Sequence, residues 1–159
     1  MEIDRPARET VLVLVAGLAF MCGLIHAGAA VDHFDELPLY TVAFGMLAAT
    51  QMLWAGTILR RPSERLLLLG GAFNLAIVGL WIVSRTVGLP IAPQAWVPET
   101  VGVADLVETV GEFAVVLAVW SVAFSTRARI ARRVSENIAP SLVFMLFVMA
   151  LFGVGAHAG

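Results

Sequence analysis

Hydrophobic residues in this chain fall into five long runs separated by short polar segments. The runs cover about residues 10–31, 37–59, 66–87, 101–124 and 138–158. Each is close to the roughly 20 residues that an α-helix needs to cross the hydrocarbon core of a bilayer. We therefore expect an all-α fold, a polytopic membrane bundle of five transmembrane helices in which residues 1–159 form a single helical domain.

The composition excludes an ordinary soluble domain. Hydrophobic residues make up 60% of the chain, charged residues make up 14%, and the mean hydropathy is +0.90. A soluble domain carries about a quarter charged residues. The net charge of −2 gives no reason to expect a nucleic-acid partner, so the expected partner is the lipid bilayer. A single cysteine also excludes an intramolecular disulfide.

Arginines predict the orientation of the chain in the membrane. They cluster in residues 5–8, 60–65 and 127–133, which lie at alternate ends of successive hydrophobic runs. All three clusters therefore share one side of the membrane, and arginine-rich loops favour the cytoplasmic side. We expect the amino terminus to be cytoplasmic and the carboxyl terminus to be extracytoplasmic.

Two of the three histidines share one face of the first predicted helix. At 100° per residue, Cys22, His26, His33 and Glu36 fall within a sector of roughly 80°. His26 lies about 10 Å deeper in the membrane than His33, at 1.5 Å per residue. The helix therefore presents nitrogen donors at two depths, whereas Cys22 is expected to pack as a small apolar residue.

Three carboxylates share one face of the fourth predicted helix. Asp105, Glu108 and Glu112 are separated by three and then four residues, the spacing that aligns side chains on a helix. This helix enters the membrane from the side where the first helix ends, so its carboxylates reach the depth of His26. A charge inside a bilayer costs about 2.5–3.5 kcal/mol on the insertion scale. These carboxylates are therefore expected to be paired, protonated or bound to a cation.

Imidazole nitrogen and carboxylate oxygen together suit a divalent transition metal such as zinc, copper or iron. We predict an extracytoplasmic-side metal site with the ligands His26, His33, Glu108 and Glu112. Around it we expect a peripheral polar site formed by Glu36, Arg85, Glu99, Asp105 and His157. Whether the metal serves catalysis, transport or sensing stays open at this point, and so does whether the protein is an enzyme.

Three alternatives use the same residues differently. A haem between His26 and His157 would make the protein an electron carrier. A proton- or cation-conducting path through the carboxylates would call for a homo-oligomer, because five helices are few for one transport path. A structural subunit would use the ion pairs only to fix helix packing.

Two further polar residues lie inside the second and third predicted helices. Gln51 and Asn74 are expected to hydrogen-bond across the helix interface, with Gly70 and Gly71 permitting close approach. At this point we assign them a packing role.

Three motifs resemble a group of small bacterial polytopic membrane proteins. They are His26-x6-His33-x2-Glu36, Ser84-Arg-Thr-x-Gly-Leu-Pro90, and Pro98-Glu99 followed by Asp105 and Glu112. The resemblance covers about residues 20–125 and implies no particular activity. It implies that Arg85 and the Gly-Leu-Pro loop belong to the predicted site, and it places the chain in a bacterial inner (cell) membrane as a multi-pass protein.

Overall fold

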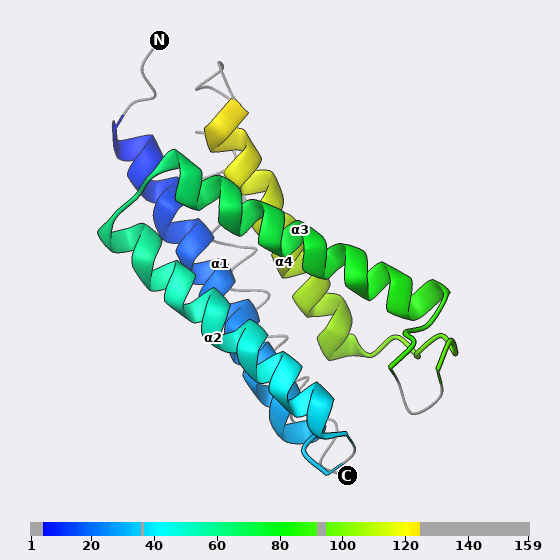
Figure 1. Ribbon diagram of the computed structural model, residues 1–159. Coiled ribbons are helices and arrows are strands. Elements are labelled where there is room, and N and C mark those ends of the chain that lie inside the picture. Colours follow the sequence, from blue (N-terminus) through cyan, green and yellow to red (C-terminus); the bar gives the residue numbers. More distant parts are fainter. Residues whose placement is uncertain (1–4, 36, 92–94, 125–159) are drawn as a thin grey trace.

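The computed structural model describes residues 5–35, 37–91 and 95–124, and the regular structure in these ranges is α-helical (Figure 1). The helices are α1 (Arg5–Asp32), α2 (Pro38–Arg60), α3 (Glu64–Thr86) and α4 (Val103–Phe124). They correspond to the first four predicted runs, although α1 begins about a turn earlier than its apolar run. The predicted fifth helix, over 138–158, lies outside the described residues and stays a prediction.

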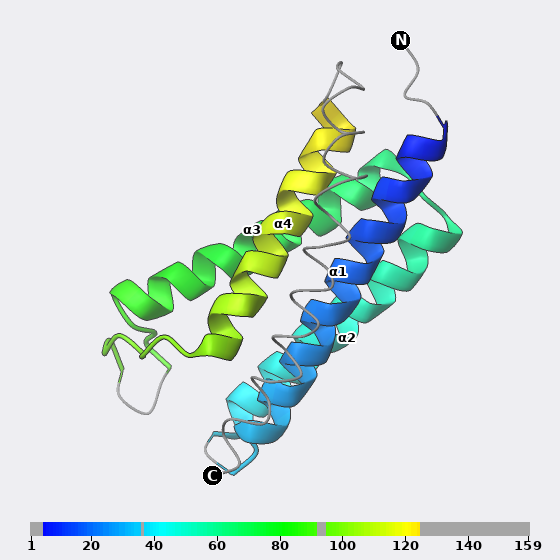
Figure 2. The ribbon, with the colours of Figure 1, turned by 180° about the vertical axis from the view of Figure 1, so that it is seen from behind.

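The four helices form two antiparallel hairpins that pack against each other. One hairpin is α1 with α2, the other is α3 with α4, and α4 also runs antiparallel along α1 (Figures 1 and 2). After the turn at residues 61–63, α3 diverges from α2 and crosses over the bundle towards α4. The contact between α1 and α4 is the one that the predicted site requires.

Local sequence signals explain where α2 and α3 begin. Pro38 occupies the first turn of α2, where backbone N–H groups have no partner within the helix, so the missing N–H of proline costs no hydrogen bond. Ser63 caps α3, and its side chain accepts a hydrogen bond from the backbone N–H of Leu66 at 3.2 Å. Pro62 stands in the turn between the two helices, where its ring does not suit a continuing helix.

The hydrophobic core lies where α1, α2 and α4 meet. Val15 and Ala19 on α1, Ile58 on α2 and Val115 on α4 have 1% or less of their surface exposed. Alanine and valine are short, so they let the helix backbones approach closely, as is usual between membrane helices. This close approach brings the polar side chains of α1 and α4 within reach of one another.

Two adjacent glycines on α3 allow close packing of the neighbouring helices. A Cβ atom on Gly70 would lie 1.9 Å from Cε2 of the Trp54 indole, and one on Gly71 would lie 2.9 Å from Cγ1 of Val119. The Trp54 indole N–H also donates to the carbonyl oxygen of Leu66 at 2.8 Å. Gly70 and Gly71 therefore permit the close approach that the sequence predicts.

Large apolar side chains point outward on every helix. Val13, Leu53, Leu69 and Leu117 have 60%, 72%, 68% and 53% of their surface exposed. Such continuous apolar exposure is unusual for a soluble monomer and suits a lipid environment. Three helices of the described part, namely α1, α2 and α3, are long and apolar enough to cross a membrane. The described chain is thus a helical bundle of the membrane type.

Candidate metal centre

Three ionisable side chains meet inside the bundle, and we call them the buried triad: His26 on α1, and Glu108 and Glu112 on α4. Nδ1 of His26 lies 2.7 Å from Oε1 of Glu108, and Nε2 lies 3.2 Å from Oε1 of Glu112. Exposed fractions are 2% for His26, 8% for Glu108 and 1% for Glu112. The imidazole therefore stands between two carboxylates that have almost no access to water or lipid.

Helix geometry explains why these three residues converge. Glu108 and Glu112 are one turn apart, so both face α1. Side chains lean towards the amino terminus of their helix, and α1 and α4 run in opposite directions. His26 and Glu112 consequently lean towards one another along the bundle axis. Valines at 107 and 115 pack into the core on the same side of α4 and hold this face inward.

The donor set fits a metal ion. One ligand atom from each of His26, Glu108 and Glu112 can be chosen so that all of them lie within 4.8 Å of one another. Although Nδ1 of His26 and Oε1 of Glu108 are close, their angles do not satisfy a hydrogen bond, and both atoms are buried. Buried polar atoms without a hydrogen bond are uncommon in native proteins. A shared cation would satisfy both atoms at once.

Charge balance also bears on what this cluster can hold. Two carboxylates and a neutral imidazole carry two negative charges. Burying uncompensated charge is very costly, so the cluster calls for compensation by protons or by a cation. A divalent cation would balance both carboxylates while leaving the imidazole neutral and able to coordinate. Among the described residues, the side chains that lie close enough to share one metal ion are those of His26, Glu108 and Glu112.

Gln51 on α2 contacts the triad, which the sequence analysis did not anticipate. Its Nε2 donates to Oε1 of Glu112 at 3.0 Å and to Oδ1 of Asn74 at 3.2 Å. Gln51 and Asn74 are both fully buried. The predicted hydrogen bond between Gln51 and Asn74 is present, but the sequence pattern led us to assign Gln51 to packing alone. A fully polar side chain inside an apolar helix was the signal that should have linked it to the carboxylates.

His33, a predicted ligand, is not part of this group. Its ring stacks on Phe44 at a centroid distance of 5.4 Å and meets the edge of Tyr40 at 5.6 Å. Phe44 also contacts the ring of His26, at 5.8 Å. His33 follows the last residue of α1, seven residues or about two helical turns after His26, and so lies roughly 10 Å further along the helix axis. The structure thus gives His33 aromatic contacts with α2 and does not bring it to the triad.

Cys22 lies one turn from His26 but contributes no ligand. It is buried, and its Sγ lies 3.9 Å from the backbone carbonyl oxygen of Glu108, the acceptor of its thiol. This contact packs α1 against α4, in keeping with the expected packing role. Glu36 and His157, both predicted for the peripheral site, lie outside the described residues, and so does the haem pair that would use His157.

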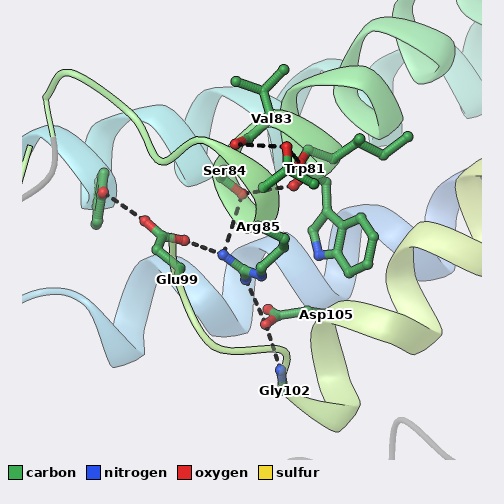
Figure 3. Close-up of polar contacts among 10 residues, drawn as sticks. Trp81, Val83, Ser84, Arg85, Glu99, Gly102 and Asp105 are labelled. Carbon is green, nitrogen blue, oxygen red and sulfur yellow. Dashed lines mark hydrogen bonds and ion pairs between the residues drawn. The ribbon is translucent and has the colours of Figure 1, made fainter. Parts of the chain in front are cut away.

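The remaining predicted peripheral residues are Arg85, Glu99 and Asp105. Together with Tyr40 on α2 they form a second group, which we call the loop cluster. The guanidinium of Arg85 lies between the two carboxylates: Nη2 donates to Oδ2 of Asp105 at 2.7 Å, and Nη1 donates to Oε2 of Glu99 (Figure 3). The hydroxyl of Tyr40 donates to the other oxygen of Glu99 at 3.0 Å. Arg85 therefore joins these residues to one another and not to His26.

The loop cluster also fixes the connection between α3 and α4. Asp105 accepts a hydrogen bond from the backbone N–H of Gly102 at 3.0 Å (Figure 3). The backbone N–H of Glu99 donates to the carbonyl oxygen of Ser84 at 3.0 Å. Gly88 turns the chain with a φ of 80°, a conformation that glycine adopts without strain. The Gly-Leu-Pro loop is thus fastened by the loop cluster.

Comparisons with known proteins give little further guidance. No family model matches the sequence, and no solved structure matches it. The chain is similar to the glutathione-regulated potassium-efflux system protein KefC of Salmonella typhi, with 32% identity over 98 residues. The similarity covers 55% of this chain, and the chain spans only 15% of the length of that protein. It agrees with a membrane protein and does not place the chain in a family.

Proposed function

We propose that this protein is an integral membrane protein whose buried triad binds a divalent transition metal through His26, Glu108 and Glu112. Support comes from three ligand atoms within 4.8 Å of one another in an otherwise apolar helix bundle. One nitrogen and carboxylate oxygens suit zinc or iron, and imidazole also suits copper. His33 has no place in the proposed ligand set, because its ring is engaged with Phe44 and Tyr40.

The observation that carries this proposal is the close, buried approach of His26 Nδ1 to Glu108 Oε1, at 2.7 Å, beside a second buried carboxylate on Glu112. An imidazole nitrogen and a carboxylate oxygen this close together could both ligate one metal ion. Glu112 supplies the further charge that neutralises a divalent ion. Three protein ligands leave a coordination position for water or a small ligand, as in catalytic and transport sites.

The distribution of arginines supports an orientation with the amino terminus in the cytoplasm. In that orientation the triad belongs to the extracytoplasmic half of the membrane, at the inner (cell) membrane of a bacterium. A metal bound there is supplied from outside the cytoplasm, which fits uptake, sensing or chemistry on an extracytoplasmic substrate.

Elemental analysis tests the metal assignment directly. The full chain is purified in mild detergent without chelators, loaded with zinc ion and freed of excess, beside His26→Ala and the control Asp35→Asn. Asp35 is an exposed carboxylate outside the triad. We expect bound zinc in the wild type and in Asp35→Asn, and its loss in His26→Ala. Equal zinc content in all three proteins, or none in the wild type, contradicts the proposal.

A second candidate is a cation- or proton-conducting function through the same carboxylates. It is favoured by the similarity to a potassium-efflux system protein and by the burial of Glu112 inside the bundle. This candidate calls for assembly of several copies, because four or five helices are few for one path. Potassium or proton flux in liposomes that Glu112→Gln abolishes, with no bound metal in the wild type, would favour it over the metal site.

A further inference from the structure

Polar side chains continue from the buried triad across α2 to α3. The sequence of contacts runs from the backbone of α3 through Asn74 and Gln51 to Glu112. Nδ2 of Asn74 donates to the carbonyl oxygen of Gly70 at 2.8 Å, Nε2 of Gln51 donates to Oδ1 of Asn74 at 3.2 Å, and the same nitrogen donates to Glu112 at 3.0 Å. We call Asn74 and Gln51 the amide relay.

The relay has a fixed direction, which its first member sets. The carbonyl oxygen of Gly70 can only accept, so the amide nitrogen of Asn74 faces it and the amide oxygen faces Gln51. That oxygen can also only accept, so Gln51 presents its NH2 group. An NH2 group has two hydrogens, and the second one points to Oε1 of Glu112. Neither amide can turn over without placing two acceptors against each other.

The geometry points to Gln51 as a positioning residue: we propose that the amide relay holds the Glu112 carboxylate in the orientation that binds the metal, and thereby sets the affinity of the site. This inference rests on the proposed metal function. Gln51 and Asn74 would act through Glu112 and touch no metal themselves. Such outer partners orient ligating carboxylates in metal sites generally.

Burial makes the relay a stringent constraint. Gln51 and Asn74 have no exposed surface, and Glu112 has 1%. Bulk water therefore has little access to these atoms, and the hydrogen-bond contacts of the Glu112 carboxylate among the described residues come from Gln51 and His26. Gln51 and His26 both contact Oε1 of Glu112, at 3.0 and 3.2 Å, so this oxygen is held between α2 and α1. A free carboxylate at this place would rotate between several orientations.

The test compares cobalt ion binding to the full chain and to three variants in detergent. Gln51→Met keeps the length of the side chain and removes both donors, and Asn74→Leu removes the acceptor that orients Gln51. Ser121→Ala is the control, because Ser121 donates only to Ala118 on its own helix. Cobalt ion is the probe because its visible absorption bands respond to coordination geometry.

We expect Gln51→Met to weaken cobalt affinity by about 10–100-fold and to shift the visible bands, as loss of an outer-shell partner does. Asn74→Leu should give a smaller loss in the same direction. Ser121→Ala should remain within about twofold of the wild type. A relay that serves only packing would lower the melting temperature of the two relay variants and leave the spectrum of the bound cobalt unchanged.

If Gln51→Met binds cobalt ion with the affinity and visible spectrum of the wild type, the proposed role of the amide relay is wrong, but the metal site is unaffected. Should that variant fail to fold, the same readout on Asn74→Leu decides the matter. Absence of cobalt and zinc binding in the wild type overturns the metal function itself, and the relay with it. The two failures are therefore distinguishable.

Discussion

The buried triad and the loop cluster each place one basic side chain between two carboxylates. His26 lies between Glu108 and Glu112, and Arg85 lies between Glu99 and Asp105. Their surroundings differ. Side-chain exposure is 2%, 10% and 1% in the triad, against 12%, 34% and 38% for the side chains of Arg85, Glu99 and Asp105.

The chemistry of the central residue explains what each group can do. A guanidinium has five N–H donors, no lone pair and a permanent charge, so Arg85 pairs with its two carboxylates and has nothing to offer a metal. An imidazole has a lone pair and can exchange a proton for a metal. The loop cluster therefore fixes the α3–α4 connection, whereas the triad has the donor atoms that the proposed metal site requires. Both groups place a basic side chain between two carboxylates. They differ in whether that side chain is arginine or histidine, and in how deeply it is buried.

The largest expected contrast is between two equivalent substitutions, Glu112→Gln in the triad and Glu99→Gln in the loop cluster. Glu112→Gln removes a proposed ligand and half of the negative charge, so zinc affinity should fall by more than the roughly 10–100-fold that an outer-shell partner is worth. Glu99→Gln should leave zinc affinity unchanged. Titration of each purified protein with zinc in a competing chelator measures both. Equal losses would erase the distinction between the groups.

The next effect concerns stability. Glu112→Leu leaves the buried N–H of Gln51 without its acceptor, and an unsatisfied buried donor costs about 1–3 kcal/mol. We expect the free energy of unfolding in detergent to fall by this amount without added metal. A variant as stable as the wild type would show that neither Gln51 nor His26 depends on this carboxylate.

Arg85→Met should destabilise the loop cluster more mildly. Its carboxylate partners are partly solvated, so we expect a loss of about 1–2 kcal/mol, between the values for exposed and buried ion pairs. Salt screens partly exposed charges and hardly affects buried ones. The difference between wild type and variant should therefore shrink in 0.5 M sodium chloride (roughly a 4 Å screening length), whereas the effect of Glu112→Leu should not. Thermal unfolding at two salt concentrations checks this.

Tyr40→Phe is expected to have the smallest effect. It removes the hydrogen bond between α2 and Glu99 and keeps the ring that packs against His33. The loss should be about 0.5–1.5 kcal/mol. Zinc affinity should not change, because the hydrogen bond that is lost goes to Glu99 of the loop cluster. A change in zinc affinity would mean that the two groups are coupled through the aromatic rings.

Much of the fold follows from the sequence because membrane helices depend on length and hydropathy alone. Pro38, the arginines near residue 60 and the loop prolines mark helix ends that the structure reproduces. The pairing of His26 with Glu108 and Glu112 was also predictable, because helical spacing and alternating direction place them at one depth. The fifth helix and the orientation of the bundle remain predictions.

The contacts that sequence reasoning missed depend on details of packing. Gln51 lies about 20 Å from the start of α2, whereas His26 lies about 10 Å from the end of α1, so residue counting puts the two side chains at different levels. Side chains on α2 and α4 lean towards the ends where these helices begin, so Gln51 and Glu112 meet nearer to His26 than residue counting indicates. The partners of Arg85 depend on how residues 87–102 turn, and no periodic pattern encodes that. His33 shares the correct face, but aromatic residues of α2 engage it.

The central claim is that His26, Glu108 and Glu112 together coordinate a divalent metal. X-ray absorption at the zinc edge of the zinc-loaded full chain tests it most directly. The account predicts a shell of nitrogen and oxygen at about 2.0–2.2 Å that includes one imidazole. Loss of the imidazole signal in His26→Ala would complete the assignment. A sulfur neighbour at about 2.3 Å, which would implicate Cys22, or a shell of water alone would contradict it.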